Sequence, residues 1–137
     1  MIAVLLVTHG EIGTSLLASA AQILGATQAQ VATLSVWRQD DPDDLVLRAR
    51  ELLERIDDGD GALVLTDIFG ATPGNVVSRL LEDGHVEGVS GVSLPMLLRV
   101  LTARKKHGDL GAAVQRAVSG GAEGVVHMNV DRCRDSD

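Results

Sequence analysis

The chain alternates short apolar runs with longer segments in which apolar residues recur every three or four positions. Short apolar runs are typical of buried strands, and the longer spacing is typical of helices with one buried face. The alternation predicts an α/β fold: a single doubly wound domain with a mainly parallel sheet flanked by helices. The expected strands are 2–7, 31–36, 62–66, 86–92 and a short last strand over 124–130, and the expected helices are 13–24, 42–56, 72–81, 95–106 and 110–118.

Residues at the expected helix ends support this division. Asp41 precedes Pro42 where the second helix opens, and Gly25 follows the first helix, where glycine adopts the left-handed conformation at little cost. Thr72 and Pro73 have the order of an N-cap hydroxyl followed by a proline in the first turn. No repeat or linker interrupts the pattern, so we expect one domain over 1–130 and a polar tail over 131–137.

Composition and charge narrow the classes of partner. Apolar residues make up 45% of the chain, and Trp37 and Phe69 are its only aromatics, so base-stacking nucleic-acid modules are not expected. The net charge of −7 repels phosphate backbones and anionic membranes. The lone Cys133 allows no internal disulfide, and the opening apolar run is too short for a signal peptide or a membrane span. We therefore expect a cytoplasmic protein without nucleic acid or direct membrane insertion.

Two loops follow strands that a parallel sheet brings to one edge. Thr8-His9-Gly10 ends the first strand, and the loop from Asp67 to Thr72 follows the third. If those strands are neighbours, His9 and Asp67 lie side by side where open parallel sheets bind ligands. A carboxylate that accepts the Nδ1–H bond would leave Nε2 free to attack a phosphoryl group. The sequence therefore indicates His9 and Asp67 as catalytic candidates.

The turn before the helix that starts near Thr72 is the expected phosphate site. Free N–H groups and a partial positive charge at a helix start suit phosphate oxygens, and a glycine beside His9 allows close approach. The expected phosphate-binding residues are Gly10, Gly70, Ala71 and Thr72. Taken singly, a histidine after a strand is commonly structural, and an aspartate or Thr-Pro pair there commonly serves as a cap or a helix start. Their convergence at one edge favours function.

Other chemistries find no support in the sequence. It contains no Walker A motif or dinucleotide-binding glycine motif, so no nucleotide cofactor is expected. No His/Cys pair has the spacing of a zinc site, so no metal is expected, and no serine has a nucleophile-elbow context.

Three segments together resemble the enzyme IIA components of the mannose/fructose class of the bacterial phosphoenolpyruvate-dependent sugar phosphotransferase system. They are the strand that ends in Thr8-His9-Gly10, LTDIFGATPGNVVS at 65–78 and GVSLPMLLRVLTAR at 91–104. The resemblance covers nearly the whole chain, in the family's order and spacing. The chain differs from the family pattern at Thr72, where the family usually has serine. It also differs at Phe69, where tryptophan is common, and at Ser93, where asparagine is frequent.

The resemblance implies a phosphotransferase component, a protein-histidine phosphocarrier with its enzyme IIA domain over 1–130. His9 would be phosphorylated at Nε2 by the small carrier protein HPr, Asp67 would orient the ring, and Phe69 would belong to the partner-binding rim. The acceptor would be a separate enzyme IIB protein, because the chain ends at Asp137 with no IIB domain. Family members are typically homodimers that exchange the last strand, here 124–130.

Three alternatives stay open at this point. His9 phosphorylation could control binding to a partner without sugar transport. The fold also occurs in the phosphocarrier subunit of the dihydroxyacetone kinase system, although the residues around the histidine differ there. A purely structural domain is the third. The sugar, if there is one, is not indicated.

Overall fold

Four parallel strands form the sheet of the computed structural model, which describes residues 1–130. The strands are β1 (Ala3–His9), β2 (Val31–Val36), β3 (Ala62–Thr66) and β4 (Val86–Ser90), in the spatial order β2-β1-β3-β4. Val7 of β1 pairs with Thr66 of β3, and His9 pairs with Val36 of β2. The order changes direction between β1 and β3, and the expected pairing of these strands is confirmed. The proposed tail at 131–137 lies outside the described residues.

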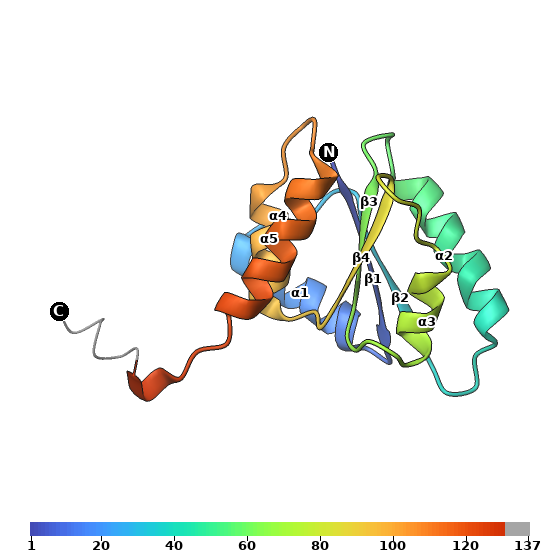
Figure 1. The fold of residues 1–137 in the computed structure, drawn as a ribbon, viewed down its shortest axis with the longest axis horizontal. Helices are drawn as coiled ribbons and strands as arrows, with labels where there is room; N and C mark the ends of the chain where they lie inside the picture. Colours follow the sequence, from blue (N-terminus) through green and yellow to red (C-terminus); the bar gives the residue numbers. More distant parts are fainter. Residues whose placement is uncertain (131–137) are drawn as a thin grey trace.

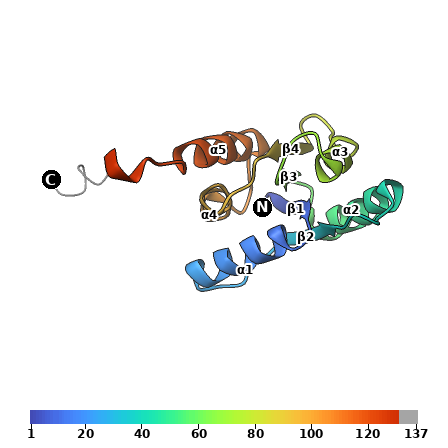
Figure 2. The ribbon, with the colours of Figure 1, turned by 90° about the horizontal axis from the view of Figure 1, so that it is seen from below.

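Helices cover both faces of this sheet (Figures 1 and 2). On one face lie α2 (Pro42–Ile56) and α3 (Thr72–Ser78). On the other lie α1 (Ile12–Leu24), α4 (Leu94–Ala103) and α5 (Leu110–Glu123). Strands that are covered on both faces need apolar side chains on both sides, which explains the uninterrupted apolar runs in the sequence. The expected α/β doubly wound fold is confirmed.

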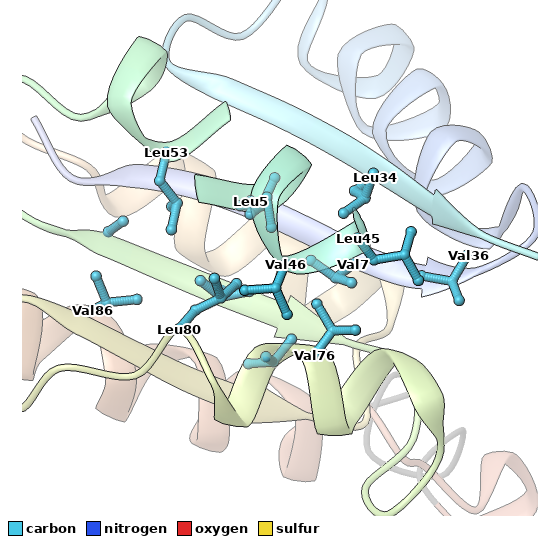
Figure 3. Close-up of a cluster of buried hydrophobic side chains, with 14 of the residues drawn as sticks. Leu5, Val7, Leu34, Val36, Leu45, Val46, Leu53, Val76, Leu80 and Val86 are labelled. Atoms are coloured by element: carbon cyan, nitrogen blue, oxygen red, sulfur yellow. The ribbon is translucent and has the colours of Figure 1, made fainter. Parts of the chain in front are cut away.

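The central strand β1 supplies side chains to two separate cores. Leu5 and Val7 pack with Leu45, Val46 and Val76 on the α2 and α3 side (Figure 3). The alternate residues of β1 point to the opposite face, where they pack against α1, α4 and α5. Each fully buried leucine or valine stabilises the fold by about 1.5–3 kcal/mol relative to exposure. His9 thus ends a strand that is anchored on both sides.

Two helix ends agree with the sequence expectation, and both ends of α3 differ from it. Gly25 has φ 72° at the end of α1, and Asp41 caps α2 by accepting from Asp43 N at 3.1 Å, as expected. Helix α3 starts one residue earlier than a Thr72 cap implies. Ala71 is the cap, its carbonyl accepts from Asn75 N, and Thr72 is already helical. α3 ends at Ser78, short of 81.

Helix α5 runs to Glu123, five residues beyond the expected end at 118. Its buried positions Leu110, Ala113, Ala117 and Gly120 recur at helical spacing, so packing against α4 continues through the glycine pair at 120–121. Tertiary contacts here outweigh the low helix propensity of glycine.

The expected last strand at 124–130 is wrong for the single chain. Residues 125–127 have no regular structure, and 128–130 form a helical turn outside the sheet. In Figure 1 this segment extends away from the rest of the domain. A strand requires a neighbouring backbone for its hydrogen bonds, and this segment pairs with no strand among residues 1–130. Its apolar side chains are exposed: Val125, Val126, Met128 and Val130.

Candidate functional site

His9 and Asp67 meet at the carboxyl edge of the sheet. His9 is the last residue of β1, and Asp67 directly follows β3. The His9 Nδ1 atom lies 2.8 Å from Asp67 Oδ2, within hydrogen-bond distance. The expected proximity of the two side chains is therefore confirmed, and it lies where the strand order changes direction, the usual ligand position in such sheets.

The Asp67 carboxylate contacts both the backbone N–H and the ring of His9. Oδ2 accepts from the His9 backbone N–H at 3.1 Å in addition to contacting the ring. The Asp67 side chain is 12% exposed, whereas the His9 side chain is 47% exposed. A fixed, mostly buried carboxylate thus orients an imidazole that remains open to solvent.

The charge of Asp67 is maintained by its neighbour. Partial burial alone would raise the pKa of the Asp67 carboxyl, but the hydrogen bonds from the His9 ring and from the His9 backbone outweigh it, and the pKa is lowered. An ionised carboxylate can only accept hydrogen bonds, so Nδ1 must be the donor. In the neutral ring, Nε2 then carries the lone pair. No other group among residues 1–130 hydrogen-bonds the His9 ring.

The turn after His9 is fixed by Thr8. This threonine is buried at 1% exposure, and its Oγ1 accepts from Gly13 N at 2.8 Å. That bond satisfies a donor in the first turn of α1, which has no side-chain cap at Glu11. The end of β1 and the start of α1 are therefore tied together around His9.

Trp37 is a neighbour of the site that the sequence analysis missed. Gly10 donates its N–H to Val36 O at 2.9 Å, and Trp37 follows Val36. A Cβ added at Gly10 would lie 3.3 Å from the Trp37 ring, and Gly10 has φ 50°. Gly10 therefore has both the left-handed backbone and the lack of a side chain that this contact requires. The signal that could have found Trp37 is the pairing of β1 with β2.

Three of the four expected phosphate-binding residues lie in the loop that begins at Asp67, and the fourth, Gly10, directly follows β1. Gly70 and Thr72 are exposed, Ala71 is half-buried, and the first turn of α3 has no side-chain cap. Pro73 has no N–H, so Thr72 and Gly74 carry the available donors of this turn. The structure brings none of Gly70, Ala71 and Thr72 into hydrogen-bond contact with the His9 ring.

Exposed apolar side chains occur in the segments that flank His9. Phe69 is 82% exposed in the loop after β3. Ile68 in the same loop, Ile12 at the start of α1 and Trp37 after β2 are also exposed. We call these four residues the apolar rim. Among residues 1–130, no group of three or more His, Cys, Asp and Glu side chains is arranged to hold a metal ion.

One family of known proteins matches most of the chain. The model of the family described as "PTS system fructose IIA component" matches residues 3–118. The chain belongs to this enzyme IIA family of the sugar phosphotransferase system. The resemblance noted in the sequence is confirmed.

Individual relatives carry related names. The chain is 34% identical over 125 residues to the "PTS system mannose-specific EIIAB component" of Escherichia coli, covering 90% of this chain but 38% of that protein. It is 31% identical over 106 residues to the "PTS system fructose-specific EIIA component" of Bacillus subtilis, covering 77% of this chain and 72% of that protein. A crystal structure of phosphotransferase system component EIIA from Streptococcus agalactiae superposes with a TM-score of 0.84 at 27% identity, covering 95% and 99% of the two chains.

Within residues 1–130, none of the helices combines the length and the apolar character needed to span a bilayer.

Proposed function

We propose that this protein is a phosphocarrier whose His9 accepts a phosphoryl group from the phosphohistidine of HPr. In the cytoplasm, it then transfers the group to a separate enzyme IIB protein, as a step of sugar transport. The observation that carries the proposal is the Nδ1–Oδ2 hydrogen bond of 2.8 Å between His9 and Asp67, on an otherwise exposed ring. Family membership supports the same role.

The transfer forms one P–N bond and breaks another. The lone pair of His9 Nε2 attacks phosphorus while the bond to the HPr imidazole breaks and its electron pair returns to HPr. The phosphorylated His9 ring retains its proton on Nδ1 and is therefore positively charged. The Asp67 carboxylate, fixed beside that proton, stabilises the charge as it develops, so positioning and electrostatics supply the catalysis. In a second displacement, a nucleophile of the acceptor attacks phosphorus while the P–Nε2 bond breaks and its electron pair returns to His9.

The phosphoryl oxygens would bind the turn after Asp67 together with Gly10, the residue after His9. We assign this role to Gly10, Gly70, Ala71 and Thr72. The uncapped first turn of α3 supports it, because its N–H groups lack side-chain partners. The exposed Thr72 hydroxyl offers one further donor.

The partner proteins would dock on the apolar rim. Phe69, with 82% of its surface exposed, is the expected anchor, because large exposed aromatics contribute strongly to protein interfaces. Ile68, Ile12 and Trp37 extend this surface around the His9 edge. The net charge of −7 favours encounter with a basic partner surface.

The segment 124–130 would be exchanged between two copies in a homodimer. Its exposed Val125, Val126, Met128 and Val130 do not pack on the sheet of their own chain. Pairing with the sheet of a second copy would bury these side chains and satisfy the backbone. Sedimentation analysis of the full chain tests this: a dimer that dissociates in Val126→Asp supports exchange, and a wild-type monomer contradicts it.

The test of the phosphocarrier role is incubation with phosphoenolpyruvate, enzyme I and HPr, followed by intact mass at mildly alkaline pH. We expect a gain of one phosphoryl mass that is acid-labile and absent from His9→Ala. His85→Ala is the matched control, because His85 is partly exposed and directly precedes β4, at the edge of the sheet opposite His9. No gain in wild type, with HPr confirmed on another acceptor, would overturn the proposal.

The fate of the phosphoryl group separates transport from regulation. Turnover to an enzyme IIB acceptor supports the transport role. Stable binding of a partner to one phosphorylation state, without turnover, would support the regulatory alternative, in which the same His9 site acts as a switch.

A further inference from the structure

A cavity lies at the opposite edge of the sheet from His9. Ile2, just before β1, lines it together with residues of the connection between α4 and α5. In Figure 1 the N-terminus lies beside this connection, while β1 runs away from it toward His9. The seven residues of β1 span about 20 Å at the rise of a parallel strand. The cavity is therefore separate from the His9–Asp67 pair.

The lining of this cavity is strongly basic. Arg104, Lys105 and Arg116 contribute three positive charges, and His107 adds a polar ring. Asp109 is the acid among the described lining residues, and its Oδ1 accepts from Ala112 N at 3.3 Å as the cap of α5. In a chain of net charge −7, this cavity carries an excess of two positive charges.

Within the described residues, the three bases of the cavity have no acidic partners. Across residues 1–130, neither arginine nor the lysine forms an ion pair, in contrast to Arg99, which pairs with Glu123. The neighbouring Asp60 does not serve them, because its Oδ2 accepts from the Met1 ammonium group and from Gly108 N. The two excess positive charges of the cavity thus have no ion-pair partner among residues 1–130.

Arg104 is the most informative of these residues. Its Nη1 donates to Ile2 O at 3.2 Å, but its Nε is buried and has no hydrogen-bond partner among the described residues. Burial also lowers the pKa of the Arg104 guanidinium. A guanidinium that is partly removed from water is costly without a counter-charge, and an anion bound in the cavity would supply that counter-charge.

We propose that this cavity is a binding site for a small molecule that carries a phosphate monoester. Arg104, Lys105 and Arg116 line the cavity, and their positive charges would bind the phosphate oxygens. A phosphate monoester is close to a dianion at neutral pH, which matches the excess of two positive charges. The site does not depend on the chemistry of His9.

The test is a two-dimensional ¹H–¹⁵N NMR titration of the full chain with glycerol 3-phosphate at constant ionic strength, with glycerol as the uncharged control. We expect saturating shifts of the amides over 104–116, with a dissociation constant of about 1 mM or tighter. Shifts confined to 9–13 and 67–75 would assign the phosphate to the His9 edge and overturn the proposal. Absence of saturation would overturn it as well.

Two variants with one control locate the binding. Lys105→Gln, at an exposed position, and Arg104→Gln should each weaken binding by about tenfold, since each removes a charged hydrogen-bond donor. Arg99→Gln on α4 removes an arginine outside the cavity and should leave the affinity unchanged. Equal affinity in Lys105→Gln and wild type would contradict the site even if Arg104→Gln fails to fold. Phosphorylation of His9 in the same variants, measured by mass, tests the phosphocarrier role separately.

Discussion

The Trp37 ring lies directly against Gly10, so that a methyl group added at Gly10 would sit 3.3 Å from it. Gly10 is the residue after His9, and Trp37 follows the β2 residue that pairs with His9. The contact thus joins the β2 side of the sheet to the loop that presents the candidate nucleophile. Gly10 also has φ 50°, a conformation that L side chains rarely adopt.

Substitution Gly10→Ala should therefore combine backbone strain with displacement of the indole. The positive φ alone costs about 1 kcal/mol for a residue with a side chain. The Trp37 side chain is 46% exposed, so the ring can move by the small distance that the new methyl group requires. We expect a loss of about 1 kcal/mol in the free energy of unfolding, measured by urea denaturation, and a changed Trp37 emission spectrum.

The matched control for that variant is Gly25→Ala. Gly25 has φ 72°, but nothing lies within 4 Å of an added Cβ. This variant should lose similar stability while its Trp37 emission stays that of the wild type. Unchanged emission in Gly10→Ala would contradict the contact as described.

Trp37 should also report the phosphorylation state of His9. The chain has one tryptophan and no tyrosine, so its emission comes from this ring. A phosphoryl group on His9 adds negative charge beside Gly10 and changes the local field at the indole. We expect a change of Trp37 emission on phosphorylation with trace enzyme I and HPr, and its reversal on acid hydrolysis. His9→Ala should give no change under the same conditions; a change there would mean that the signal has another origin.

The central part of the site could be predicted because it depends on strand order and strand ends. The continuous apolar runs predict that His9 and Asp67 lie at the ends of two buried strands. Because β1 and β3 pair in parallel, His9 Nδ1 lies 2.8 Å from Asp67 Oδ2. The Trp37 contact required more, because it depends on the register of β2, where Val36 lies opposite His9. Apolar periodicity does not specify which residues of neighbouring strands face each other.

The segment 124–130 marks the limit of reasoning from pattern. Its apolar residues predict a strand, but a strand forms only where another backbone completes its hydrogen bonds. In the single chain those side chains stay exposed and the segment lies outside the sheet. At α3, similarly, the Thr-Pro signal indicated a helix start, but Ala71 provides the cap because its extended backbone precedes the first helical hydrogen bond.

Loss of the Asp67 charge should slow phosphoryl transfer more than it affects folding. Asp67→Asn keeps the shape of the side chain but removes the charge that stabilises the phosphorylated ring, and it can present an amide donor to Nδ1. We expect the rate of phosphorylation by HPr to fall by about 10²-fold or more, measured by quenched time points and intact mass. Asp57→Asn, which alters a similarly buried carboxylate that lies 2.9 Å from the His85 ring, is the control and should transfer at the wild-type rate. An equal rate in Asp67→Asn would remove Asp67 from the mechanism.

The stability that Asp67 contributes should depend on pH in one direction. The pKa of its carboxyl is lowered in the folded protein, because the hydrogen bonds from His9 outweigh the effect of burial. A carboxyl with a depressed folded pKa stabilises the protein above its unfolded pKa of about 4 and loses that contribution as pH falls through the folded value. Wild type should therefore exceed Asp67→Asn in the free energy of unfolding at neutral pH, and the difference should shrink below about pH 4. Urea denaturation of both proteins across this range measures it. Glu54→Gln, at an exposed position of α2, controls for the loss of an acidic side chain on the surface. A difference between wild type and Asp67→Asn that stays constant down to low pH would mean that the hydrogen bonds from His9 do not stabilise the ionised carboxylate.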